Sequence, residues 1–232
     1  MKNIIITGGT SGIGKTFVES FTSSDKCYIL SSKKHVSDEN KNYIKCDLSS
    51  EKDLDKFINL INENKITIDS LVHSAGVTYP LNQELHYSDW EKTLKVNFFS
   101  ISYLMKGLEE NMASNSSIVL ISSIGGQLGF KKNPSYQISK ASIIQYTKSL
   151  AIDLSPQTRV NCIAPGYIQT DMTKKSFENT DMNNKIKEST LLNRWGKSIE
   201  VAEVIKFLIS EKSSYINGQT INVDGGWVVK GL

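Results

Sequence analysis

Three polar side chains in one stretch of the chain could carry out proton chemistry. Tyr136 and Lys140 lie four residues apart, and Ser123 precedes Tyr136 by thirteen residues. Residues four apart on a helix share a face, so the phenol and the ammonium group are expected to project together. A nearby ammonium stabilises a phenolate and lowers a tyrosine pKa from its ordinary value of about 10. With Ser123 hydrogen-bonded to the substrate oxygen, the set predicts a proton donor for a carbonyl group. A Tyr-x-x-x-Lys pair alone is also common on ordinary helix surfaces, which is the alternative.

A glycine-rich segment near the N-terminus predicts a site for the phosphates of a dinucleotide. Gly8, Gly12 and Gly14 follow an apolar run and open a segment of helical periodicity, the context in which such a turn binds phosphate. Gly8 would permit the tight turn, Gly12 the approach of pyrophosphate, and Gly14 close packing of the helix. Free N–H groups and the helix dipole near Ile13 favour an anion. A purely structural turn is one alternative. Phosphoryl transfer is the other, although no partner segment of the Walker type accompanies Gly14-Lys15-Thr16.

The residues after the second predicted strand bear on the choice of cofactor. An acidic side chain there would hydrogen-bond the ribose 2′-hydroxyl of NAD. Ser32 falls at this position and Lys33 follows it, with no carboxylate before Asp38. A hydroxyl and an ammonium would accept a 2′-phosphate. NADP(H) is therefore favoured over NAD(H), with a merely solvated Lys33-Lys34 loop as the alternative.

The elements that must position these residues alternate between short apolar runs and longer helical segments. The predicted strands are Asn3–Thr7, Cys27–Ser31, Tyr43–Cys46, Ser70–His73, Ser117–Ser122, Arg159–Ala164 and Thr220–Val223. The predicted helices are Ile13–Ser23, Glu51–Asn64, Ser88–Met112, Tyr136–Leu154 and Ile199–Ser210. This alternation predicts an α/β fold, a doubly wound, mostly parallel, Rossmann-like sheet, in a single domain over residues 1–232. The Ser31–Asn42 connection offers only about ten residues and is expected to lack a full helix.

Composition indicates a globular protein of ordinary chemistry. Hydrophobic residues make up 39% and charged residues 22% of the 232-residue chain. The net charge of +3 gives no indication of nucleic acid or a membrane surface as partner. No apolar stretch approaches the ~20 residues needed to span a bilayer, and we expect no signal peptide. Cys27, Cys46 and Cys162 lack metal-ligand spacing and are expected to be buried, reduced thiols. We therefore predict a cytoplasmic protein with no metal site.

Taken together, these features resemble the short-chain dehydrogenase/reductase family over essentially the whole chain. The matching pieces are Thr7-Gly8, Gly12, Gly14, Asp47-Leu48, Ser74-Ala75-Gly76, Asn97, Ser123, Tyr136 with Lys140, Pro165-Gly166 and the segment from Asn222 to Gly226. The resemblance implies that Tyr136 is the acid/base and that Ser123 orients the carbonyl. It implies that Lys140 holds the nicotinamide ribose and lowers the tyrosine pKa. Asn97 would hold a water between Lys140 and solvent, with a hydrogen bond to the backbone as the alternative.

The same resemblance implies further cofactor contacts along the chain. Thr10, Ser11 and Ile13 would join the glycines around the phosphates. Asp47 and Leu48 would border the adenine. Ala75 and Gly76 would lie on the adenosine ribose side, while Tyr136 and Lys140 contact the cofactor as well as the substrate. The nicotinamide carboxamide would be surrounded by Pro165, Gly166, Ile168 and Thr170, although Pro165-Gly166 could also be a simple turn.

Three segments depart from the family pattern. His73 stands where the family usually has asparagine, and we expect it to end a strand as a hydrogen-bonded polar residue. The short Ser31–Asn42 connection is expected to leave the adenine side more open. The polar segment from Asp171 to about Trp195 corresponds to a mobile substrate lid in the family.

The resemblance implies an NADP(H)-dependent oxidoreductase that interconverts a ketone or aldehyde and an alcohol by hydride transfer. Residues 164–172 and 216–226 are most similar to 3-oxoacyl-[acyl-carrier-protein] reductases, so a 3-oxoacyl thioester is a candidate substrate. The neighbourhoods Ala113-Ser114-Asn115 and Ser155-Pro156-Gln157 lack the arginines expected for carrier recognition, so a small metabolite or sugar-derived substrate stays open. The alternative is a non-catalytic NADP-binding regulator or scaffold. Homodimers or homotetramers are expected through the two longest helices, with Trp227 contributing.

Overall fold

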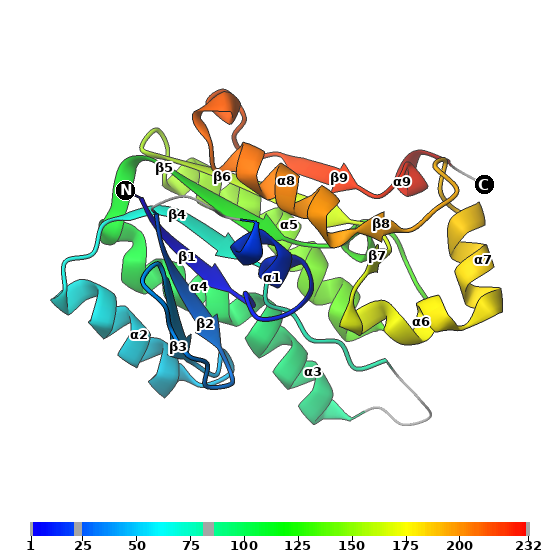
Figure 1. The fold of residues 1–232 in the computed structure, drawn as a ribbon, viewed down its shortest axis with the longest axis horizontal. Coiled ribbons are helices and arrows are strands. Elements are labelled where there is room, and N and C mark those ends of the chain that lie inside the picture. The colour runs from blue at the N-terminus through cyan, green and yellow to red at the C-terminus, as the bar shows by residue number, and fades with distance from the viewer. Residues whose placement is uncertain (1, 21–24, 81–85, 231–232) are drawn as a thin grey trace.

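The computed structural model describes residues 2–20, 25–80 and 86–230, and its centre is a seven-stranded sheet (Figure 1). The order is β3-β2-β1-β4-β5-β6-β9, and every neighbouring pair is parallel. The strands are β1 (Asn3–Thr7), β2 (Lys26–Ser31), β3 (Lys41–Lys45), β4 (Ile68–His73), β5 (Met112–Ile121), β6 (Thr158–Pro165) and β9 (Thr220–Val223). The predicted doubly wound α/β fold is confirmed. The order reverses between β1 and β4, and ligands of such sheets bind at the carboxyl ends of the strands beside this reversal.

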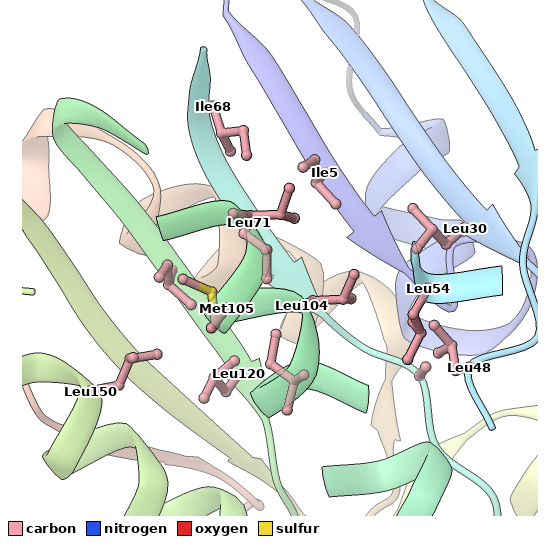
Figure 2. Packing of buried hydrophobic residues seen from close by; sticks show 14 of the residues in the cluster. Ile5, Leu30, Leu48, Leu54, Ile68, Leu71, Leu104, Met105, Leu120 and Leu150 are labelled. Carbon is pink, nitrogen blue, oxygen red and sulfur yellow. The ribbon is translucent and has the colours of Figure 1, made fainter. Parts of the chain in front are cut away.

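Helices cover both faces of the sheet because successive strand residues point to opposite sides. On one face, α2 (Glu51–Glu63), α4 (Ser100–Leu108) and α5 (Pro134–Asp153) pack on strand residues such as Ile5, Leu71 and Leu120. Figure 2 shows this cluster from close by. On the other face, α1 (Gly12–Glu19) and α8 (Ser198–Leu208) cover Ile4, Ile6 and Val119. The continuous apolar runs therefore serve two cores at once.

The connection between β2 and β3 contains no helix, as predicted from its length. It turns at Asp38, whose carboxylate accepts hydrogen bonds from the backbone N–H groups of Asn40 and Lys41. The Ser37 hydroxyl accepts a third hydrogen bond, from the N–H of Tyr43. Side-chain acceptors thus replace helical hydrogen bonding in this short crossover.

The predicted continuous helix from Ser88 to Met112 is wrong. The segment consists of α3 (Tyr87–Leu94), a π-helical turn (Lys95–Phe99), α4 and a 3-10 turn (Glu109–Asn111), and Met112 already belongs to β5. The π turn lies at Asn97, whose side chain and carbonyl both bond to groups outside the helix. Long-range partners therefore widen one turn of a helix whose sequence shows no break.

Other boundaries differ by smaller amounts. Strand β5 ends at Ile121, so Ser123 follows the strand instead of closing it. Helix α1 ends at Glu19, and the last three residues predicted for it, 21–23, lie outside the described residues. The segment expected to be a lid holds a 3-10 turn (Asp171–Thr173), α6 (Lys174–Glu178) and α7 (Thr180–Glu188). A short pair, β7 (Ile168–Gln169) with β8 (Gly196–Lys197), and α9 (Trp227–Lys230) complete the chain.

Two expectations about composition can be compared with the described part of the chain. The three cysteines are free and buried, as expected. Within residues 2–20, 25–80 and 86–230, no helix is both long and apolar enough to cross a bilayer, and no group of acidic, histidine and cysteine side chains is arranged to hold a metal ion.

Candidate active site

A cleft of about 460 Å³ opens at the carboxyl ends of β1, β4, β5 and β6. It brings together almost all of the predicted site residues. Those that line it are Gly8, Thr10, Ser11, Gly12, Ile13, Ser32, Asp47, Leu48, Ala75, Gly76, Ser123, Tyr136, Lys140, Pro165, Gly166, Ile168 and Thr170. Gly14, Lys33 and Asn97 lie outside this lining. The glycine turn and the Tyr/Lys pair, far apart in sequence, therefore share one cavity.

The glycine turn at one end of the cleft fits a phosphate group. Gly8 and Gly12 have φ angles of +73° and +50°, which favour glycine. A Cβ on Gly8 would lie 2.7 Å from the Cα of Ala75, and one on Gly14 would lie 2.4 Å from the carbonyl oxygen of Gly8. Gly14 thus acts through close packing, which is why it does not line the cleft. Ser11, at the N-terminus of α1, makes no capping hydrogen bond through its side chain, so the N–H groups there are available to an anion.

The opposite flank of the turn carries the residues predicted to contact the adenosine. Ser32 lines the cleft and is exposed. Lys33 is exposed beside it, and its N–H donates to the Ser31 hydroxyl over 3.2 Å. The Asp47 carboxylate accepts from the N–H and the hydroxyl of Ser49, at 2.9 and 2.7 Å, which fixes its orientation at the cleft wall. This flank offers hydroxyl and ammonium groups to an anionic ligand.

Helix α5 positions the predicted catalytic pair. Pro134 starts the helix at its first turn, where a missing N–H costs nothing. Tyr136 and Lys140 then follow on one face, with the Lys140 ammonium 5.7 Å from the centre of the Tyr136 ring. Tyr136 hydrogen-bonds to Ser123, which also accepts from the N–H of Gly125 over 3.0 Å. A phenol and a serine hydroxyl in contact can bind one carbonyl oxygen between them.

The electrostatics of this pair differ from the sequence prediction. Burial raises the pKa of Tyr136, and the hydrogen bond to Ser123 only partly opposes this. Burial also lowers the pKa of Lys140 to about 8. The Lys140 ammonium donates to the carbonyl of Ile121 over 2.8 Å. In this arrangement Lys140 therefore does not lower the tyrosine pKa, because its charge is directed at a carbonyl and weakened by burial.

Asn97 has the backbone contacts that were the alternative interpretation for it. Its side-chain oxygen accepts from the N–H of Val77 over 2.8 Å. Its amide nitrogen donates to the carbonyl of Val77 and to the hydroxyl of Ser139, both at 3.0 Å. The residue is buried under the cleft, where it joins the loop after β4 to α5. Asn97 therefore supports the site without lining it.

Sequence reasoning missed several residues that complete the cleft. Tyr79, Lys92, Val96, Met172 and Thr173 all line it. The Lys92 ammonium lies 6.0 Å from the centre of the Tyr79 ring. Because Lys92 and Val96 are four apart, helical spacing places both on one face, and Val96 stands next to the predicted Asn97. That spacing was the available signal for Lys92, whereas nothing in the sequence marks Tyr79.

Comparisons with known proteins agree with this site. A family profile described as Enoyl-(Acyl carrier protein) reductase matches residues 10–228. The 3-oxoacyl-[acyl-carrier-protein] reductase FabG of Aquifex aeolicus is 37% identical over 238 residues, covering 96% of this chain and 95% of that protein. A short chain dehydrogenase family protein from Francisella tularensis has a TM-score of 0.92 at 30% identity, over 99% of this chain and 100% of that one. A 4-hydroxyisoleucine dehydrogenase complexed with NADH has a TM-score of 0.93 at 26% identity, over 100% of both chains.

These relatives span almost the whole chain, and the cleft holds the glycine turn and the Ser/Tyr/Lys set by which the family is recognised. The chain therefore belongs to the short-chain dehydrogenase/reductase family of oxidoreductases, which act on alcohol and carbonyl groups with a nicotinamide cofactor.

Proposed function

We propose that Tyr136 is the acid/base of an NADP(H)-dependent reductase of a 3-oxoacyl thioester. The observation that carries this proposal is the shared cleft, in which the Tyr136–Ser123 contact lies in the same cavity as the glycine turn. A dinucleotide with its phosphates on that turn would extend along the carboxyl edge of the sheet toward Tyr136.

The roles of the side chains follow from their contacts. The nicotinamide cofactor supplies or accepts the hydride when bound. Ser123 and Tyr136 hold the carbonyl oxygen, and Tyr136 donates its phenolic proton to that oxygen as it becomes an alcohol. Lys140 lies beside the phenol with a pKa of about 8, so it is largely an ammonium at neutral pH. It contacts the ribose side of the cofactor and replaces the positive field that the phenolate requires.

The preference for NADP(H) rests on the β2–β3 connection. Ser32 lies in the cleft wall and Lys33 adjoins it, so both could approach a 2′-phosphate. The first carboxylate of the connection, Asp38, is occupied by two backbone N–H groups at its turn. An NAD-type contact to the ribose hydroxyls therefore has no free acidic side chain in this connection.

The substrate class rests on the relatives. The Aquifex aeolicus protein is named a 3-oxoacyl-[acyl-carrier-protein] reductase, and it covers nearly the whole chain at 37% identity. A 3-oxoacyl thioester presents a ketone for Tyr136 and Ser123. The residues at 113–115 and 155–157 carry no arginine, so we propose that the thioester is recognised without a strong electrostatic contact to a carrier protein.

The proposed function is tested by following NADPH consumption with a panel of carbonyl compounds. The panel comprises a 3-oxoacyl group on acyl carrier protein, the same group on a small thiol, simple ketones and aldehydes, and an aldose. Turnover of both thioesters, with similar kcat/KM, is expected. Turnover of the sugar or of ketones alone would contradict the substrate class. Tight NADPH binding with no turnover of any compound would favour a non-catalytic regulator instead.

We also propose a cytoplasmic location and a homo-oligomeric state. Three free, buried cysteines suit a reducing compartment. Exposed apolar side chains along α5 suit contact with a second copy of the chain.

A further inference from the structure

His73 is a buried ionisable residue to which the proposed reaction gives no role. It is the last residue of β4 and its side chain is fully buried, as expected for a hydrogen-bonded strand end. Its Nδ1 lies 2.8 Å from the hydroxyl of Thr7, at the end of β1. Its Nε2 lies 3.2 Å from the carbonyl oxygen of Asn97, in the π turn. The imidazole therefore bridges two strand ends and the widened helical turn.

The hydrogen bonds determine the tautomer of this ring. A carbonyl oxygen can only accept, so Nε2 carries the hydrogen and donates to Asn97. In a neutral ring Nδ1 is then an acceptor, and the Thr7 hydroxyl donates to it. The Thr7 oxygen also accepts from the N–H of Ala75 over 3.3 Å. Burial, with the charge of Lys140 adding to it, lowers the pKa of His73 to about 3, so the ring stays neutral near neutral pH.

A continuous series of hydrogen bonds leads from His73 to the catalytic helix. The carbonyl of Asn97 is held by His73, and its amide donates to the Ser139 hydroxyl over 3.0 Å. Ser139 in turn donates to the carbonyl of Tyr136 over 2.7 Å. At the other end, Thr7 directly precedes Gly8 of the phosphate turn. His73 therefore lies between the glycine turn and the first turn of α5.

There is little free space around this series. A Cβ added to Gly76 would lie 3.3 Å from the Lys140 nitrogen and 3.6 Å from the side-chain oxygen of Asn97. A shift of the π turn would therefore reach Lys140 directly, because packed interiors transmit displacements instead of absorbing them.

We propose that His73 is a positioning residue that acts through Asn97 and Ser139 to set Tyr136 and Lys140 at the right distance from the glycine turn. This inference rests on the proposed function, since its main readout is the rate of carbonyl reduction. Its essential contact is the donation from Nε2 to the carbonyl of Asn97.

The test compares three substitutions that differ in which contact they keep. The amide nitrogen of His73→Gln can take the place of Nε2 and still donate to Asn97. The shorter side chain of His73→Asn reaches only toward Thr7, and His73→Leu keeps neither contact. We expect kcat to fall by roughly ten- to a hundredfold in the Asn and Leu variants, the range expected when a reacting group is misplaced from a distance. The Gln variant should recover most of that loss, with KM for NADPH little changed in all three.

Ser117→Ala is the matched control for lost stability. Ser117 is also buried in the sheet, and its hydroxyl donates to the carbonyl of Leu208 over 2.9 Å, on the face covered by α8. This variant should unfold at a lower temperature and keep the wild-type kcat. Wild-type kcat in the Asn variant, or a Gln variant as slow as Leu, would overturn the inference.

A second readout separates this inference from the proposed function. If the wild type reduces no carbonyl compound, the proposed function fails, and the phenol of Tyr136 can still be titrated by ultraviolet absorbance against a Tyr136→Phe reference. Positioning by His73 predicts a shifted Tyr136 titration in the Asn variant and a wild-type titration in the Gln variant. Identical titrations in both variants would overturn it.

Discussion

Two opposing influences act on the phenol of Tyr136. Burial holds its proton on, while the hydrogen bond to Ser123 favours its release. Such a group donates its proton readily only when a substrate oxygen gains negative charge beside it. The arrangement suits a general acid in carbonyl reduction, with the barrier lowered at the moment of hydride transfer.

Replacing Tyr136 by phenylalanine removes the proton donor and little else. We expect Tyr136→Phe to lower kcat by roughly two to four orders of magnitude, the usual contribution of a general acid. The dissociation constant for NADPH, measured by fluorescence, should stay near the wild-type value. Tyr146→Phe is the control, because Tyr146 lies on the same helix but packs against Phe98 in the core. Near-normal turnover in Tyr136→Phe would rule out its acid/base role.

Lys140 makes a prediction about stability against pH. Its pKa is lowered from 10.5 to about 8 in the folded chain. Between these values the unfolded chain binds a proton that the folded chain does not, so stability rises with pH across this window. At neutral pH the buried ammonium costs about 3 kcal/mol, at about 1.4 kcal/mol for each pH unit. The stability gained on Lys140→Met should therefore shrink by about 3 kcal/mol from pH 7 to pH 10.5.

Urea unfolding at a series of pH values measures this difference. Groups common to the wild type and the variant cancel, so the change isolates Lys140. Lys148→Met, on the exposed side of the same helix, is the control. A wild-type-minus-variant difference that stays constant over the whole pH range would show that Lys140 is not a destabilised ammonium.

At the scale of elements, the sequence identified which helix and which strand ends carry the site but not how one helix bends. The spacing of Tyr136 and Lys140 lies within α5, so local periodicity sufficed. The π turn at Asn97 depends on Val77 and Ser139, which are distant in sequence. A single sequence does not show such partners, and the periodicity from Ser88 to Met112 continues through the turn. Lys140 was misjudged for the same reason, because burial of its ammonium is a property of the packed structure.

The β2–β3 connection carries the prediction about cofactor choice. Ser32→Asp places a carboxylate where the 2′-phosphate of NADP would approach, and the repulsion between the two anions should weaken NADPH binding. We expect the ratio of kcat/KM for NADPH to that for NADH to fall by about tenfold or more, equivalent to about 1.4 kcal/mol. Steady-state kinetics with both cofactors measure this ratio.

Ser37→Asp is the matched control for added charge in the same connection. Ser37 is exposed at the turn, outside the cleft lining, where its hydroxyl accepts from the N–H of Tyr43. Its cofactor ratio should stay near the wild-type value. An unchanged ratio in Ser32→Asp would show that the phosphate is bound by other residues.

At the scale of the whole molecule, the sheet order explains why distant segments meet in one cleft. The chain reverses direction of strand addition between β1 and β4, so the carboxyl ends of these strands diverge into helices on opposite faces. The glycine turn comes from one side of this reversal and Tyr136 from the other (Figure 1). Alternating elements in the sequence were enough to predict this architecture, because parallel strands require crossovers of one hand.

The outer side of α5 suggests how copies of the chain associate. Ile138 and Ile152 are 49% and 77% exposed, and about four helical turns separate them, so they lie on one outward face. Phe99, 54% exposed beside α4, adds a third apolar side chain on an element that packs against α5. Trp227, expected to join an interface, instead packs against Phe130 and Tyr167 within the chain.

A charged residue in the centre of such a face should separate the copies. An unpaired arginine buried in an apolar interface carries a desolvation penalty of several kcal/mol. We therefore expect the wild type to be a dimer or tetramer by light scattering, and Ile152→Arg to have a smaller mass at the same concentration. Val36→Arg, at an exposed position in the β2–β3 connection, should leave the mass unchanged. A monomeric wild type would exclude assembly altogether, and an Ile152→Arg variant of full mass would place the contact on another face.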